Sequence, residues 1–120
     1  MATVVATLPG LYNVLVDNAD AAGTGSFEIY GNGAVSCGTY LQHRSQNGKL
    51  YWMDAAWVEG WLSCINATGG GDILEGTDID GAMAWIANYC RAHPLRPFSV
   101  ATEDLSSHLV SKWMRSHKEK

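Results

Sequence analysis

The part of this sequence that most constrains the fold is residues 49–68, KLYWMDAAWVEGWLSCINAT, which hold three of the five tryptophans. Apolar residues recur in it at the three- and four-residue spacing of an α-helix. We expect one stripe of this helix to face the core, formed by Met53, Trp57, Trp61, Cys64 and Ile65. The alternative is an aromatic row that stacks on a ligand or a partner.

A second row of the same helix carries small residues, which are Ala56, Gly60, Ser63 and Ala67. Glycine inside a helix costs about 1 kcal/mol relative to alanine, so its presence suggests close packing. The row therefore predicts that a neighbouring helix approaches this face closely.

Three further helices are predicted from capping and breaking residues. Ser36 is suited to cap a short helix that ends near residues 46–48. Glycines 69–71 end the tryptophan helix and are expected to form a flexible linker. Thr77 or Asp78 is placed to cap a helix over residues 79–92, in preference to a calcium site in the acidic residues around it.

The last two helices supply the rest of the predicted core. Pro94 ends the helix over residues 79–92, and Pro97 suits the first turn of a final helix. At helical spacing they carry the predicted core residues Met83, Ile86, Leu105 and Leu109.

Residues 1–34 are predicted to form an irregular N-terminal arm ahead of a helical domain at 35–120. Apolar residues 4–8 and 11–16 are separated by Pro9 and Gly10, and residues 27–30 could pair with 11–16 in a short β-hairpin. No Lys or Arg precedes the apolar part, so we expect an ordered arm rather than a removed leader. The predicted fold class is therefore mainly α, with four helices and one disulfide.

Composition narrows the function classes. Charged residues make up 17% of the chain, the net charge is -4, and Lys and Arg form no stripe outside the last few residues, which argues against a nucleic-acid surface. No apolar run reaches the roughly 18 residues of a membrane span. Neither zinc-ligand spacing nor a phosphate-binding glycine pattern occurs, so no metal and no cofactor is predicted.

Catalytic patterns are also missing, and we predict that the chain is not an enzyme. A small hydrolase would need His43, His93 or His108 beside Cys64 or a serine in a cleft. The three cysteines allow one bridge with three possible pairings, and one thiol is then left over. A bridge would indicate an oxidising compartment.

Four segments together resemble a known group of proteins. They are SCGTY at 36–40, WVEGWLS at 57–63, TDIDG at 77–81 and WIANYCRAHPL at 85–95. Their order is similar to that in small exported bacterial helical proteins, which look like distant relatives of the acid-stress chaperone HdeA and of the Rap1a/Tai immunity proteins. The resemblance covers about residues 34–110.

This resemblance implies that Cys37 and Cys90 are bridged and that Cys64 is the free thiol. Closing a loop of that length would stabilise the fold by about 4 kcal/mol if loop entropy dominates. Cys64 stands where the group commonly has glycine, and it is expected to be buried and inert.

We therefore expect a protein-binding domain of the periplasm or the secreted space, such as an immunity protein, an inhibitor or a holdase-like chaperone. Its partner would be another protein, with a homodimer left open. The alternative is a cytoplasmic, phage-encoded inhibitor of a host enzyme or defence system, with all cysteines reduced. The binding surface is expected near residues 69–75, on the N-terminal arm or at the basic C-terminal end.

Overall fold

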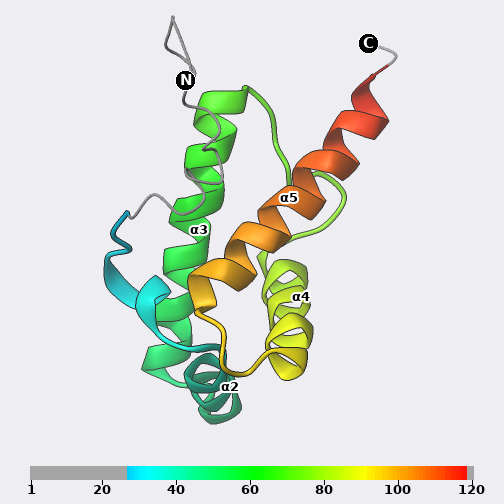
Figure 1. The fold of residues 1–120 in the computed structure, drawn as a ribbon. Coiled ribbons are helices and arrows are strands. Elements are labelled where there is room, and N and C mark those ends of the chain that lie inside the picture. The colour runs from blue at the N-terminus through cyan, green and yellow to red at the C-terminus, as the bar shows by residue number, and fades with distance from the viewer. Residues whose placement is uncertain (1–26, 119–120) are drawn as a thin grey trace, which may run out of the picture.

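The computed structural model describes residues 27–118, which form a short 3-10 helix and four α-helices (Figure 1). The elements are η1 (Gly31–Ala34), α2 (Cys37–Gln46), α3 (Lys49–Gly69), α4 (Ile79–Ala92) and α5 (Phe98–His117). The predicted mainly α-helical fold is confirmed. Residues 27–30 form no strand, so that part of the predicted hairpin is wrong, and residues 11–16 lie outside the described part.

The predicted caps begin two of the helices. Ser36 Oγ accepts a hydrogen bond from the backbone of Thr39 at 3.1 Å, and Asp78 Oδ1 accepts one from Gly81 at 2.8 Å. Each bond satisfies a backbone donor that the first turn of a helix leaves free. Asp78 therefore acts as a helix cap, as the capping interpretation of the acidic residues predicted.

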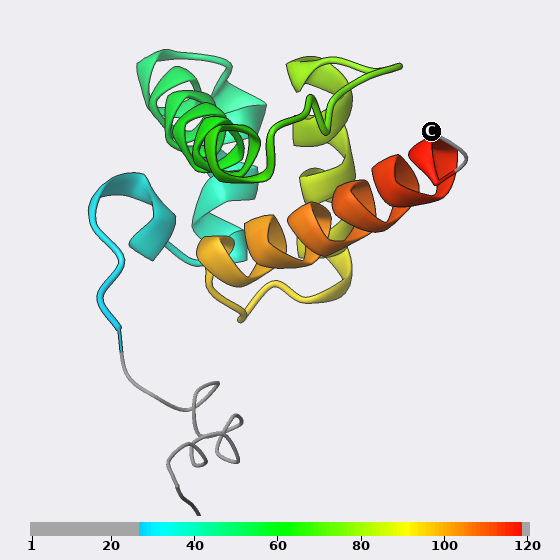
Figure 2. The same ribbon diagram turned by 90° about the horizontal axis from the view of Figure 1, so that it is seen from above.

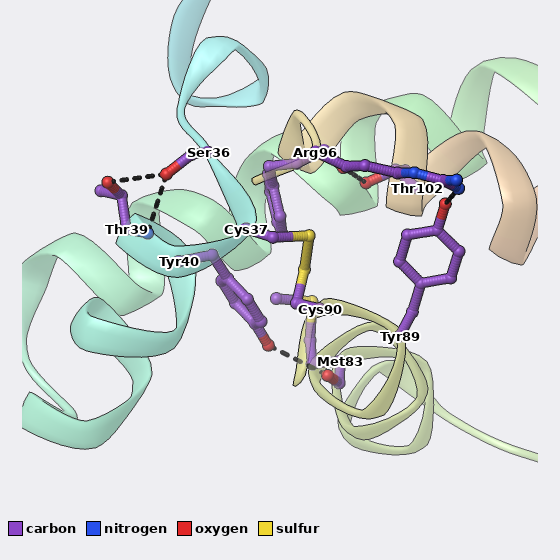
Figure 3. Close-up of a disulfide and its surroundings, with 10 residues drawn as sticks. Ser36, Cys37, Thr39, Tyr40, Met83, Tyr89, Cys90, Arg96 and Thr102 are labelled. Carbon is purple, nitrogen blue, oxygen red and sulfur yellow. Dashed lines mark hydrogen bonds between the residues drawn. A yellow bond between two sulfur atoms is a disulfide. The ribbon is translucent and has the colours of Figure 1, made fainter. Parts of the chain in front are cut away.

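A disulfide between Cys37 and Cys90 joins the first turn of α2 to the last turn of α4 (Figure 3). Both cysteines are fully buried. Backbone bonds surround the bridge: Cys37 donates to Arg96 at 2.7 Å, and Gly38 donates to Pro94 at 2.9 Å. The start of α2, the end of α4 and the link to α5 thus meet at one point, which we call the bridged base.

The buried face of α3 differs from the predicted stripe. Its buried residues are Tyr51, Asp54, Ala55, Val58 and Leu62. Met53 is 45% exposed and Cys64 is exposed, so their predicted burial is wrong. The other members of the predicted stripe lie at the edge of the core, partly buried: Trp57, Trp61 and Ile65. The helix is rotated relative to the prediction because a carboxylate, Asp54, has polar partners inside.

The predicted core residues of α4 and α5 are all buried, namely Met83, Ile86, Leu105 and Leu109. Two polar residues of α5 are buried beside them. Thr102 donates its hydroxyl proton to the carbonyl of Phe98 at 3.0 Å, and Ser106 donates to that of Thr102 at 2.9 Å. These bonds to the preceding turn let hydroxyl groups enter an apolar interior.

The expected close approach at Gly60 does not occur, because a Cβ there would meet no atom within 4 Å. The close contact is instead at Gly33 in η1, where a Cβ would overlap the ring of Trp57. The Nε1 of the same ring donates to the carbonyl of Tyr30 at 2.8 Å. Trp57 therefore fastens η1 to the side of α3.

The segment between α3 and α4, residues 70–78, is a structured connector and not the flexible linker that was predicted. Gly70 caps α3 in the left-handed conformation, with φ of 76°. Asn66 Oδ1 accepts from the backbone of Ile73 at 3.0 Å, and the Ile73 side chain is buried. A Cβ on Gly71 would come within 2.7 Å of the Trp113 ring, so the connector passes close against α5.

The bridge should contribute strongly to stability. Replacing Cys37 and Cys90 together with alanine is expected to lower the free energy of unfolding by about 4 kcal/mol, because the unfolded chain regains the freedom of a long loop. Urea denaturation under non-reducing conditions measures this loss. The exposed Cys64→Ala variant is the control and should stay within about 0.5 kcal/mol of the parent. An equal effect of both replacements would contradict the prediction.

Two glycines should respond in opposite directions to alanine. Gly33→Ala is expected to cost about 1–3 kcal/mol, because the new methyl group displaces the Trp57 ring. Gly60→Ala is expected to stabilise by about 0.5–1 kcal/mol, because it lies in an open helical position. Thermal unfolding of both variants measures the difference. Stabilisation by Gly33→Ala would contradict the contact with Trp57, and destabilisation by Gly60→Ala would contradict the open position.

Candidate functional site

Two places in the described residues gather side chains of functional type: a buried polar cluster where η1, α2 and α3 meet, and an apolar groove between α3 and α5. The polar cluster centres on Asp54, which is fully buried. Its Oδ1 accepts from Asn32 Nδ2 at 2.8 Å, and its Oδ2 lies 2.8 Å from His43 Nδ1. These bonds join η1, α2 and α3 through one carboxylate, and they offset the cost of its burial.

Beside this carboxylate lies a tyrosine pair. Tyr40 donates its hydroxyl proton to the carbonyl of Met83 at 2.9 Å (Figure 3), and Arg44 donates to both Tyr40 and Tyr51 at 3.3 and 3.2 Å. Burial raises the pKa of Tyr40 to about 12, despite the opposing effect of Arg44. The neutral phenol is thus the form that the fold favours.

An imidazole held by a carboxylate through Nδ1 can act as a general base if a nucleophile contacts Nε2. The side chain of His43 is only 11% exposed, and within residues 27–118 it forms no hydrogen bond to a serine or to Cys64. The hydrogen bonds of this cluster connect structural elements. We assign it a structural role.

The other histidines lie apart from one another. His93 contacts Tyr89, and His108 stacks on Trp85. His117 lies over Trp113, with its Nε2 at 3.2 Å from Glu75 of the connector. In the described part of the chain, no hydrogen bond joins the side chain of His43, His93 or His108 to Cys64 or to a serine, as a hydrolase would need.

The groove arises because α3 and α5 diverge. Figure 1 shows α3 and α5 separating toward the connector, and Figure 2 shows α3 nearly end-on with α5 lying across from it. α4 packs against α2 and α5, while α3 and α5 approach each other at few points. One of these points is a hydrogen bond of 2.9 Å from Trp61 Nε1 to Ser106 Oγ. This bond marks the narrow end of the groove.

Beyond Trp61 the groove has two adjoining hollows that share Ile65 and Val110. The first has a volume of about 620 Å³, and its lining residues are Trp61, Cys64, Ile65, Glu103, Ser106, Ser107, Val110 and Ser111. The second has about 370 Å³, and the connector closes it with Gly71 and Ile73 opposite Trp113 and Met114. Both volumes lie within the range of ligand and peptide sites.

The groove is nearly free of charge. Among the described residues that line it, Glu103 is the only charged one. Cys64 contributes an exposed thiol to the first hollow. Along α5 the first hollow is lined by serines and Val110, and the second by Val110, Trp113 and Met114, so the groove offers apolar contact with hydrogen-bonding groups at one end. This character suits the binding of another apolar surface.

Sequence reasoning located the groove only in part. It placed a binding surface near residues 69–75, and Gly69, Gly71 and Ile73 do line the second hollow. It assigned Trp61, Cys64 and Ile65 to the core, although these residues line the open side of α3. It did not single out Val110 or Met114. The sequence does contain a signal for Met114. It follows Trp113 directly, and two large apolar residues in succession on a helix cannot both face the same core.

No family model, curated protein or solved structure matches this chain. The resemblance drawn from the sequence segments therefore stays a prediction. In residues 27–118, no helix is both long and apolar enough to cross a membrane, and no group of three or more metal-binding side chains comes together.

The pKa of Tyr40 predicts a loss of stability at alkaline pH. The fold holds Tyr40 neutral up to a pKa of about 12, against 10.0 ordinarily, so its contribution is full below pH 10 and is lost as the pH rises toward 12. We expect the loss to be on the order of 2 kcal/mol. Urea denaturation at a series of pH values measures it.

The comparison is with Tyr40→Phe, which removes the titrating group. Both proteins should carry Cys64→Ala, because a thiolate formed at high pH would attack the bridge. Tyr40→Phe is expected to be about 1 kcal/mol less stable at neutral pH, since it loses the bond to Met83. Its stability should fall less between pH 10 and 12, and an identical fall in the two proteins would refute the assignment.

Proposed function

We propose that this chain is a non-catalytic protein-binding domain that binds its partner in the groove between α3 and α5. The observation that carries the proposal is the groove itself, in which two adjoining hollows leave Trp61, Ile65 and Val110 accessible. Monomeric proteins rarely leave a continuous apolar depression uncovered unless it binds something. A partner helix is the element that fits between two diverging helices, with its apolar face inward.

Fixed contacts at both ends of the groove support this proposal. The Trp61 to Ser106 bond joins α3 to α5 at one end, and Gly71 lies close against Trp113 at the other. A preformed groove binds more tightly than one that must be ordered on binding, because less conformational entropy is lost. The resemblance to immunity proteins and to an acid-stress chaperone agrees with a binding role.

A buried disulfide suggests a non-reducing compartment. We therefore favour the bacterial periplasm or the secreted space over the cytoplasm, and an immunity protein or inhibitor as the kind of binder. The alternative, a cytoplasmic inhibitor with reduced cysteines, predicts three reactive thiols in the denatured native protein, whereas the exported form predicts one.

The exposed thiol allows the partner to be captured at the groove. A photo-crosslinker attached to Cys64 should join the partner when the labelled protein is irradiated in an extract of its native host. The captured protein is then purified and its affinity for the unlabelled domain is measured by calorimetry. Capture alone does not establish the binding site. The affinities of two methionine variants for the captured partner do.

Two methionines provide a matched pair of variants. Met114 is 60% exposed and lines the groove, whereas Met53 is 45% exposed and lies outside it. Met114→Asp is expected to weaken binding about tenfold, because a buried unpaired charge costs more than 1 kcal/mol. Met53→Asp should leave the affinity unchanged. Equal affinities of the two variants would overturn the groove as the binding site.

A further inference from the structure

Tyr30, the residue just before η1, lies near the end of the groove that Trp61 marks. Tyr30 is held on α3 by the bond from Trp57, and the Trp57 ring lies 5.3 Å from the Trp61 ring, centroid to centroid. Trp61 in turn lines the first hollow. Phe27 and Tyr30 are 64% and 83% exposed. The carbonyl of Tyr30 is therefore held on α3 at Trp57, about one helical turn from Trp61 at the edge of the groove.

The preceding sequence contains an apolar segment that can reach the groove. Residues 11–16, LYNVLV, carry no charge and contain four aliphatic side chains, of which Leu11, Val14 and Leu15 share one face of a helix. Ten residues separate this segment from Phe27. An extended linker of that length reaches about 33 Å, whereas the groove from Trp61 to Thr68 extends about 10 Å along α3.

The two surfaces match in size and polarity. Six residues span about 9 Å as a helix or about 20 Å when extended, so in either form the segment is long enough for the hollows along α3. Glu103 is the only charged residue among the described residues that line them, and the segment brings no charge of its own. Association removes apolar surface of both from water, which is favourable at about 25 cal/mol per Å².

We propose that residues 11–16 of the same chain bind in the groove between α3 and α5 and cover Cys64. The groove is then occupied in the free protein, and a partner has to displace this segment. The inference rests on the groove that the proposed function uses, but it needs no partner. It can therefore fail while the proposed function holds, and the reverse is equally possible.

Cys64 reports directly on whether the groove is covered. In the full chain, with the bridge intact and no reductant, the rate of alkylation by N-ethylmaleimide follows the fraction of molecules in which the groove is open. The test variant is Leu11→Asp, Val14→Asp and Leu15→Asp combined, which makes the segment unsuitable for an apolar site. The matched control is Asn18→Asp, Thr24→Asp and Ser26→Asp combined, which adds the same charge at polar positions outside the segment.

We expect the test variant to react about tenfold faster than the parent, and the control to react at the parental rate. Equal rates for the parent and the test variant would overturn the proposal, whether both are fast or both are slow. A faster rate in both variants would overturn it as well, because the effect would then come from charge.

A crosslink locates the segment. Val14→Cys places a second thiol in the segment, and a short bis-maleimide should join it to Cys64. A crosslinked product of monomer mass is expected, with the joined peptides identified by mass spectrometry. Products of dimer mass alone would show that the groove takes the segment of a second copy, and the absence of any product joining position 14 to Cys64 would show that it takes neither. Either result would overturn the proposal.

Discussion

The fold depends on the junction at Cys37. Its side chain is bonded to Cys90 at the end of α4, and its backbone N–H donates to Arg96 in the link that leads to α5. The start of α2 is thereby fixed to the end of α4, which lies 53 residues further along the chain, and to the link that follows α4. The loop that the bridge closes contains all of α3, so the bridge limits the conformations open to these residues in the unfolded chain. The bridge and these backbone bonds therefore set how α2, α4 and the start of α5 lie against one another.

Asp54 explains why the orientation of α3 could not be predicted. Two faces of this helix carry large apolar side chains, and the periodicity of the sequence favoured the face with Met53 and Trp57. The face that is buried includes a carboxylate, which a pattern based on hydrophobicity assigns to solvent. Burial of Asp54 is favourable only because Asn32 and His43 are brought to it by η1 and α2. Those partners are 22 and 11 residues away, a distance at which sequence spacing carries no signal.

The features that the sequence did predict are local ones. Ser36 and Asp78 cap their helices by reaching the backbone three residues ahead, and the breaks at Gly70 and Pro94 depend on single residues. The buried faces of α4 and α5 followed from periodicity because few large apolar residues compete for their outer faces. The groove could not be predicted in this way. It results from the angle between α3 and α5, which depends on contacts that both helices make with other elements.

The contact between Gly71 and Trp113 has a further consequence for the groove. The connector lines the second hollow together with the ends of α3 and α5. A glycine stands where the connector meets the indole ring, and a Cβ there would come within 2.7 Å of that ring. Any side chain at position 71 would therefore have to displace the Trp113 ring, and the shape of the second hollow would change with it. This part of the groove thus depends on one residue that lies outside both helices.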